Sequence, residues 1–62
     1  MRYFLDGMEK SIMHKGTVAG LLKKIRVRRE EVVVKVNGRL APETSELGAK
    51  DRIEVIRVVF GG

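Results

Sequence analysis

Arg52-Ile-Glu-Val-Ile-Arg-Val-Val-Phe-Gly-Gly62 is the stretch that decides the fold, because a β-forming run leads straight into two glycines. Valine, isoleucine and phenylalanine favour strands, so we expect a strand over residues 52–60. Two glycines without Cβ atoms make a thin, bendable tail that a narrow channel in another protein could admit. We therefore expect a domain over residues 1–60 and a tail over residues 61–62, with the Gly62 carboxylate as a candidate reactive group. The alternative is an ordinary frayed end.

An N-terminal hairpin is predicted by two strand-like runs, residues 1–6 and 8–14, which meet at Asp6-Gly7. Asp-Gly is one of the pairs most favoured in two-residue hairpin loops. A second such signal, Asn37-Gly38, ends the valine-rich run of residues 31–37 and leads into a short segment over residues 39–41. The sequence therefore predicts two tight turns, each joining neighbouring strands.

One amphipathic helix is predicted over residues 17–27. Thr17 is a suitable N-cap. The apolar residues that follow fall at i, i+3, i+4 and i+7, the spacing of one helix face, and they are Val18, Leu21, Leu22 and Ile25. Gly20 costs about 1 kcal/mol relative to alanine inside a helix, so we expect it to pack closely against the sheet.

The resulting order, ββαββ, predicts an α+β fold in which a mixed sheet of four to five strands carries one helix on one face. Residues 43–50 are polar and predict a connection, with a turn at Leu47-Gly48. Alternation along the strands directs Ile53 and Val55 toward the helix. The residues expected on the uncovered face, near the root of the tail, are Phe4, Val33, Ile56 and Val58. We interpret them as a shared apolar patch that binds a partner; a register slip of one residue would bury them instead.

Length and composition exclude several classes of protein. A chain of 62 residues forms one domain, and the absence of cysteine excludes a disulfide framework, a thiolate zinc site and a nucleophilic thiol. The longest apolar runs are three residues, far short of the roughly 20 that cross a membrane. The sequence therefore predicts a soluble, cytoplasmic protein that does not associate with membranes.

A family resemblance is carried by three segments: Thr17-Val-Ala-Gly-Leu-Leu22, the run from Glu30 through Val-Asn-Gly to Pro42, and the run from Lys50 to Gly62. Together they resemble the ubiquitin-like β-grasp sulfur carriers of thiamine and molybdopterin biosynthesis, and are most similar to the thiamine type. The resemblance covers the chain from about residue 17 to residue 62. It implies a β-grasp fold and a carrier protein that is a substrate, not an enzyme.

The resemblance also implies roles for particular residues. Gly62 would be adenylated by a separate enzyme of the ubiquitin-activating type, then converted to a thiocarboxylate or joined to lysines of target proteins. Gly61 and Phe60 would enter that enzyme with it, and the docking surface would be formed by Val58, Ile56, Val33 and Phe4. No cofactor would be bound by the carrier, because ATP and the sulfur donor or acceptor belong to partner enzymes. Thiamine, molybdopterin, thiolated tRNA and protein conjugates all remain possible products.

The net charge of +5 favours one competing hypothesis, a non-covalent RNA-binding or protein-binding β-grasp module. Its binding surface would be the basic cluster, defined as Lys23, Lys24, Arg26, Arg28 and Arg29. Cations at a helix C-terminus are also stabilised by the helix dipole, and the cluster contains no aromatic residue on which bases could stack. We therefore expect no direct contact with nucleic acid. His14 and the acidic residues form no recognisable catalytic or metal-binding constellation.

Overall fold

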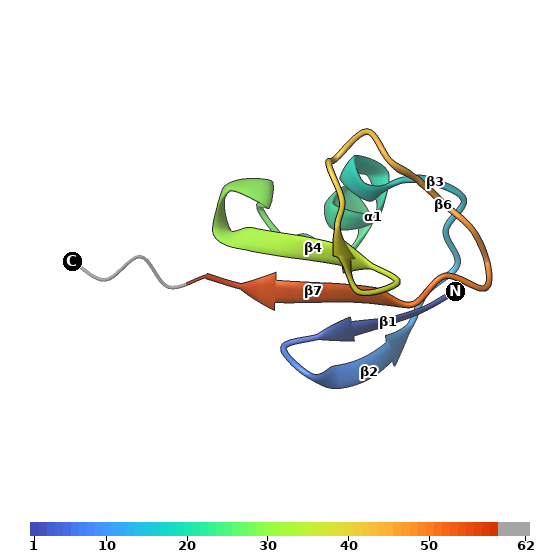
Figure 1. Cartoon of the computed structure of the whole chain (residues 1–62), viewed down its shortest axis with the longest axis horizontal. Coiled ribbons are helices and arrows are strands. Elements are labelled where there is room, and N and C mark those ends of the chain that lie inside the picture. Colours follow the sequence, from blue (N-terminus) through green and yellow to red (C-terminus); the bar gives the residue numbers. More distant parts are fainter. Residues whose placement is uncertain (59–62) are drawn as a thin grey trace.

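Residues 1–58 are described by the structure, a computed structural model of the chain (Figure 1). Within them the main sheet has five strands in the order β2-β1-β7-β4-β5, and β3 pairs separately with β6. The elements are β1 (Arg2–Leu5), β2 (Met8–Ser11), β3 (Gly16–Thr17), α1 (Val18–Lys24), the 3-10 turn η1 (Arg29–Glu31), β4 (Val32–Val36), β5 (Arg39–Leu40), β6 (Glu46–Leu47) and β7 (Ile53–Arg57). The mixed sheet with one helix against it confirms the predicted β-grasp architecture.

Both predicted hairpin turns are confirmed. Asp6 and Gly7 have φ angles of 50° and 85°, and Asn37 and Gly38 have φ angles of 54° and 82°. Positive φ at both central residues defines the type I′ turn, whose twist matches that of the flanking strands. The turns join β1 to β2 and β4 to β5 in antiparallel register.

The last strand, β7, lies at the centre of the sheet, parallel to β1 and antiparallel to β4. Its inward residues Ile53 and Val55 are fully buried, and Tyr3 and Val34 from the neighbouring strands are buried beside them. These side chains meet the buried face of α1, so the predicted assignment of the two sheet faces is confirmed. In Figure 1, β7 runs the length of the domain between β1 and β4.

The helix is shorter than predicted, because it ends at Lys24 and not at residue 27. The Thr17 side chain accepts the backbone N–H of Gly20 at 3.2 Å, which confirms the N-cap. At the other end the N–H of Val27 donates to the carbonyl of Leu22 at 3.0 Å, and Arg26 has φ of 59°. This is the Schellman arrangement, in which a left-handed residue stops the helix.

Gly20 faces a histidine, which corrects the expectation that it packs against the sheet. A Cβ at this position would lie 2.9 Å from Cε1 of His14. His14 is held there because its Nε2 lies 3.0 Å from the carbonyl oxygen of Thr17. The glycine therefore makes room for an imidazole ring that packs against the start of the helix.

Residues 43–47 are more structured than predicted. Leu47 was expected in a turn, but it is buried, and β6 pairs with β3. The carbonyls of Ser45 and Glu43 accept the N–H groups of Val18 and Ala19, the first two residues of α1. This connection therefore closes the core and satisfies two N–H donors that the helix leaves free.

No helix within residues 1–58 combines the length and the apolar character needed to cross a membrane.

Candidate functional site

The root of the tail, where β7 ends at Arg57, is the candidate functional site. On the β1 side, the Arg57 N–H donates to Oδ1 of Asp6 at 2.9 Å, and Arg57 Nε lies 3.3 Å from Oδ2 of the same carboxylate. The N–H of Asp6 donates in turn to the carbonyl of Val55 at 3.0 Å. The tight turn at Asp6-Gly7 therefore holds the end of the strand with its backbone and its side chain together.

On the other side of β7, the pairing with β4 continues past Arg57. The N–H of Val58 donates to the carbonyl of Glu31 at 2.8 Å. Glu31 is the last residue of η1, directly before β4. The chain is thus held from both flanks up to Val58, by the β1–β2 turn on one side and by η1 on the other.

An exposed apolar surface lies beside this root. Ile56 is 39% exposed and Val58 is 38% exposed, both on the face that α1 does not cover. Val33 lies directly opposite Ile56 across β4 and β7, and it is partly buried. We refer to Val33, Ile56 and Val58 as the root patch. They lie where the sequence placed them, although their predicted role in partner binding stays a prediction.

Phe4 lies at the margin of the root patch, and charged residues flank it on both neighbouring strands. Across the sheet, Phe4 is opposite Glu9 on β2 and Glu54 on β7, and Glu54 is opposite Lys35 on β4. The Arg52 guanidinium lies 4.5 Å from the centroid of the Phe4 ring, a cation–π contact that covers the aromatic face. Phe4 shares the uncovered face as expected, but at the margin of the patch.

The basic cluster is largely engaged within the molecule. Arg29 pairs with Glu43 and lies 3.4 Å from Glu30, and Arg28 lies 3.7 Å from Glu30. The hydrogen bond that Arg29 donates to the Glu43 carboxylate is the main reason why the pKa of Arg29 is raised further above its ordinary value. Lys24 donates to the Met13 carbonyl at 2.8 Å. Three of the five cations therefore have a carboxylate or carbonyl partner.

Three of the predicted site residues, Phe60, Gly61 and Gly62, lie outside the described residues, and so does the predicted domain boundary at residue 60. The interaction between Asp6 and Arg57 was not predicted. The Asp6-Gly7 pair predicts a turn. Nothing in the neighbouring sequence indicates that the Asp6 carboxylate accepts the backbone N–H of Arg57, 51 residues away. Within residues 1–58, no group of three or more histidine or acidic side chains is placed to hold a metal ion.

Comparison with known proteins adds evidence on identity. The ThiS family model matches residues 3–62. A solved structure, the thiamine biosynthesis protein (ThiS) from Geobacter metallireducens, is similar with a TM-score of 0.69 and 22% sequence identity, over 100% of both chains. No curated protein matches the sequence. At 22% identity the structural similarity supports the fold alone. The family model spans nearly the whole chain, and the chain therefore belongs to the ThiS family of ubiquitin-like sulfur carriers.

Proposed function

We propose that this protein carries sulfur on the carboxylate of Gly62. The observation that carries the proposal is the family match over residues 3–62, which includes both glycines. The central strand β7 leads toward them from a root that is hydrogen-bonded on both flanks at Arg57 and Val58. A strand end that is held on both flanks, shortly before two glycines in the sequence, suits a substrate protein that another enzyme must bind and modify.

The chemistry begins with a poor electrophile. The Gly62 carboxylate attacks the α-phosphorus of ATP in the active site of a partner enzyme, pyrophosphate leaves, and an acyl-adenylate forms. A sulfur nucleophile at the oxidation level of sulfide, such as hydrosulfide, then attacks the acyl carbon, AMP leaves with the electron pair of the broken bond, and a thiocarboxylate remains at Gly62. The carrier supplies no catalytic residue and no bound cofactor, since ATP and the sulfur donor come with its partners. The chain contains no cysteine, so a sulfur nucleophile has to come from a partner.

Docking to the adenylating enzyme is assigned to the root patch. Ile56 and Val58 offer exposed apolar surface at the end of β7, shortly before Phe60 and the two glycines in the sequence. Apolar contacts that exclude water near the centre of an interface usually contribute most of its binding energy. A partner that covers this patch would direct the following residues, Phe60 and Gly61 among them, into its active site.

Thiamine biosynthesis is the proposed pathway, because the family match is to ThiS and the similar structure is that of a thiamine biosynthesis protein. Molybdopterin synthesis, tRNA thiolation and attachment to target lysines are the alternatives. Expression in a thiamine-requiring strain that lacks its own carrier should restore growth without thiamine. A chain lacking Gly61 and Gly62 is the matched control and should not restore growth.

The cytoplasmic location expected from the sequence stays a prediction.

The direct test is intact-mass analysis after incubation with ATP, a sulfur donor and an adenylating enzyme of the ThiS pathway. The expected result is a mass gain equal to the exchange of one oxygen for sulfur, located by fragmentation at Gly62. A chain without residues 61–62 should remain unchanged. An unmodified full chain, under conditions in which the enzyme charges its own carrier, would count against the proposal.

A further inference from the structure

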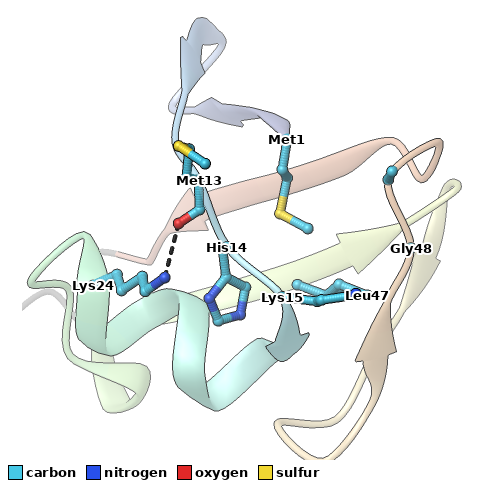
Figure 2. A pocket seen from close by; sticks show the side chains of 8 residues that line it. Met1, Met13, His14, Lys15, Lys24, Leu47 and Gly48 are labelled. Carbon is cyan, nitrogen blue, oxygen red and sulfur yellow. Dashed lines mark hydrogen bonds between the residues drawn. The ribbon is translucent and has the colours of Figure 1, made fainter.

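A second surface, separate from the root patch, is formed by a pocket at the end of the sheet where β1 and β7 begin. It has a volume of about 580 Å³ and lies between the segment before β3, the helix α1 and the connection from β6 to β7 (Figure 2). Small-molecule sites commonly have volumes of about 300 to 1,000 Å³. β7 begins at this end of the sheet, whereas the root patch lies toward its other end, so the proposed function leaves the pocket unused.

The pocket walls are mainly apolar. Met1, Met13, Leu47 and Ala49 supply them. Met13 is 90% exposed, which is unusual for a large apolar side chain. Methionine side chains are flexible and polarisable, so they adapt to ligands of different shape. These walls favour the apolar body of a ligand over a fully polar one.

The charged side chains that line the pocket are both cations. They are Lys15 and Lys24, and no acidic residue lines the pocket beside them. One of the three ammonium donors of Lys24 binds the Met13 carbonyl at 2.8 Å, which leaves two for a ligand. Lys15 makes no ion pair within residues 1–58. The charge at this pocket therefore favours an anionic group.

His14 adds an acceptor that has no partner. Its Nε2 lies 3.0 Å from the Thr17 carbonyl oxygen; a carbonyl only accepts, so Nε2 carries the hydrogen and Nδ1 of the neutral ring is an acceptor. Nδ1 is buried and makes no hydrogen bond within the described residues. The ring lines the pocket between Lys24 and Leu47 (Figure 2). A ligand with an N–H or O–H donor that reached Nδ1 would satisfy it.

We propose that this pocket binds a small amphipathic acid, with an apolar body, one carboxylate and an adjacent N–H or O–H donor. The apolar body contacts Met1, Met13 and Leu47, the carboxylate lies between the two lysines, and the donor reaches His14. The proposal is independent of Gly62, because no residue of the root patch contributes to the pocket.

N-acetylphenylalanine is a suitable probe, since it has a ring, a carboxylate and an amide N–H. In ¹H–¹⁵N spectra of the full chain it should shift the amide signals of Lys15, Gly48 and Ala49 in a saturable way. The neutral N-acetylphenylalaninamide, which differs only at the carboxylate, should bind at least about fivefold more weakly, the effect of losing about 1 kcal/mol of ion pairing. Equal shifts with both probes, or shifts spread over the sheet, would overturn the proposal.

Variants complete the test. Lys15→Glu should weaken binding at least about fivefold, and Lys10→Glu, which makes the same charge change on the exposed strand β2, should not. Ala49→Trp should block the pocket while both lysines remain, and unchanged signals elsewhere will show that the fold persists. A chain lacking residues 61–62 should still bind. Undiminished binding of N-acetylphenylalanine to both pocket variants would contradict the proposal. Tighter binding of a peptide with an internal Phe-Asp pair than of N-acetylphenylalanine would also contradict it, because it would indicate a protein partner.

Discussion

Asp6 and Arg57 are joined twice although 51 positions separate them in the sequence: the Asp6 carboxylate accepts the Arg57 backbone N–H at 2.9 Å and pairs with its guanidinium at 3.3 Å. Asp6 is also the first central residue of the β1–β2 turn, with φ of 50°. One residue therefore shapes the hairpin and holds the end of the central strand. This links the stability of the N-terminal hairpin to the position of the end of β7.

Replacement of Asp6 by alanine should destabilise the fold by about 2 kcal/mol. The variant loses a hydrogen bond to a charged acceptor and places a Cβ without a polar group in the left-handed region. Asp6→Asn keeps an acceptor and tolerates positive φ, so it should lie within about 0.5 kcal/mol of the parent. Urea unfolding of the three proteins measures the difference. Equal stability of the alanine and asparagine variants would show that the contact to Arg57 contributes nothing.

Gly20→Ala should destabilise the protein by about 1 kcal/mol, although alanine is the better helix former. The added methyl would lie 2.9 Å from Cε1 of His14 and would displace a ring that binds the Thr17 carbonyl. In a His14→Ala background the clash is gone, and the same change should stabilise by up to about 1 kcal/mol. The double-mutant cycle measured by thermal unfolding gives the sign reversal. The same sign in both backgrounds would refute the contact.

Arg26→Gly should stabilise the protein by about 1 kcal/mol. Arg26 occupies the left-handed position that ends α1, with φ of 59°, and glycine adopts this conformation without steric cost. Arg26→Ala serves as the control, because it removes the same charge and keeps the Cβ. Only the glycine variant should gain stability in urea unfolding. A gain of equal size in both would assign the effect to the charge.

The sequence predicts the parts of the fold whose signals are local. The Asp6-Gly7 and Asn37-Gly38 turns follow from residue types that tolerate positive φ. The division of β7 into a buried and an exposed side follows from simple alternation, and the resulting exposure of Ile56 places the root patch.

What could not be predicted depends on tertiary contacts. β3 and β6 have two residues each, too few to show any periodicity, and so Leu47 was assigned to a turn although it is buried. The helix end depends on a left-handed arginine, where glycine is the usual signal. The reason for Gly20 lies in His14, on a preceding connection. In each case the deciding feature is a contact between different segments or a residue type that is unusual for its position.

The protein should lose stability in acid through Asp51. The backbone N–H of Gly48, at 2.7 Å, and then the Asn37 side chain, at 3.0 Å, hold the pKa of Asp51 below its ordinary value. Because the folded-state pKa is the lower one, the stabilisation is fully present above the unfolded-state pKa of about 3.9 and is lost as the pH falls through the folded-state value. The pKa of Glu30 is lowered as well, first by its own backbone N–H, and contributes with the same sign.

Asp51→Asn isolates this contribution. The side-chain amide in this variant has one acceptor oxygen, whereas the Asp51 carboxylate has two. Its NH₂ group would therefore face one of the two donors, the Gly48 N–H or the Asn37 side chain, and the variant should be less stable at neutral pH. Its stability should also change less than that of the parent between neutral and acid pH. Glu46→Gln, on an exposed strand position, is the charge-matched control. Urea unfolding at several pH values tests this, and parallel curves for parent and Asp51→Asn would exclude the role of Asp51.

The root patch gives the most direct test of partner docking. Ile56→Asp places a charge on the uncovered face, where the parent side chain is 39% exposed. It should therefore lower the free energy of unfolding by about 1 kcal/mol or less, yet reduce kcat/KM for adenylation at least about tenfold, because a buried apolar contact becomes a desolvated charge. Leu40→Asp is the matched control, since Leu40 is 71% exposed and lies on the edge strand β5, opposite Lys35 of β4, which pairs in turn with Glu54 near the start of β7. If both variants slow adenylation equally, the enzyme contacts the whole uncovered face of the sheet and not the root patch alone. If Ile56→Asp leaves the rate of adenylation unchanged, docking occurs elsewhere.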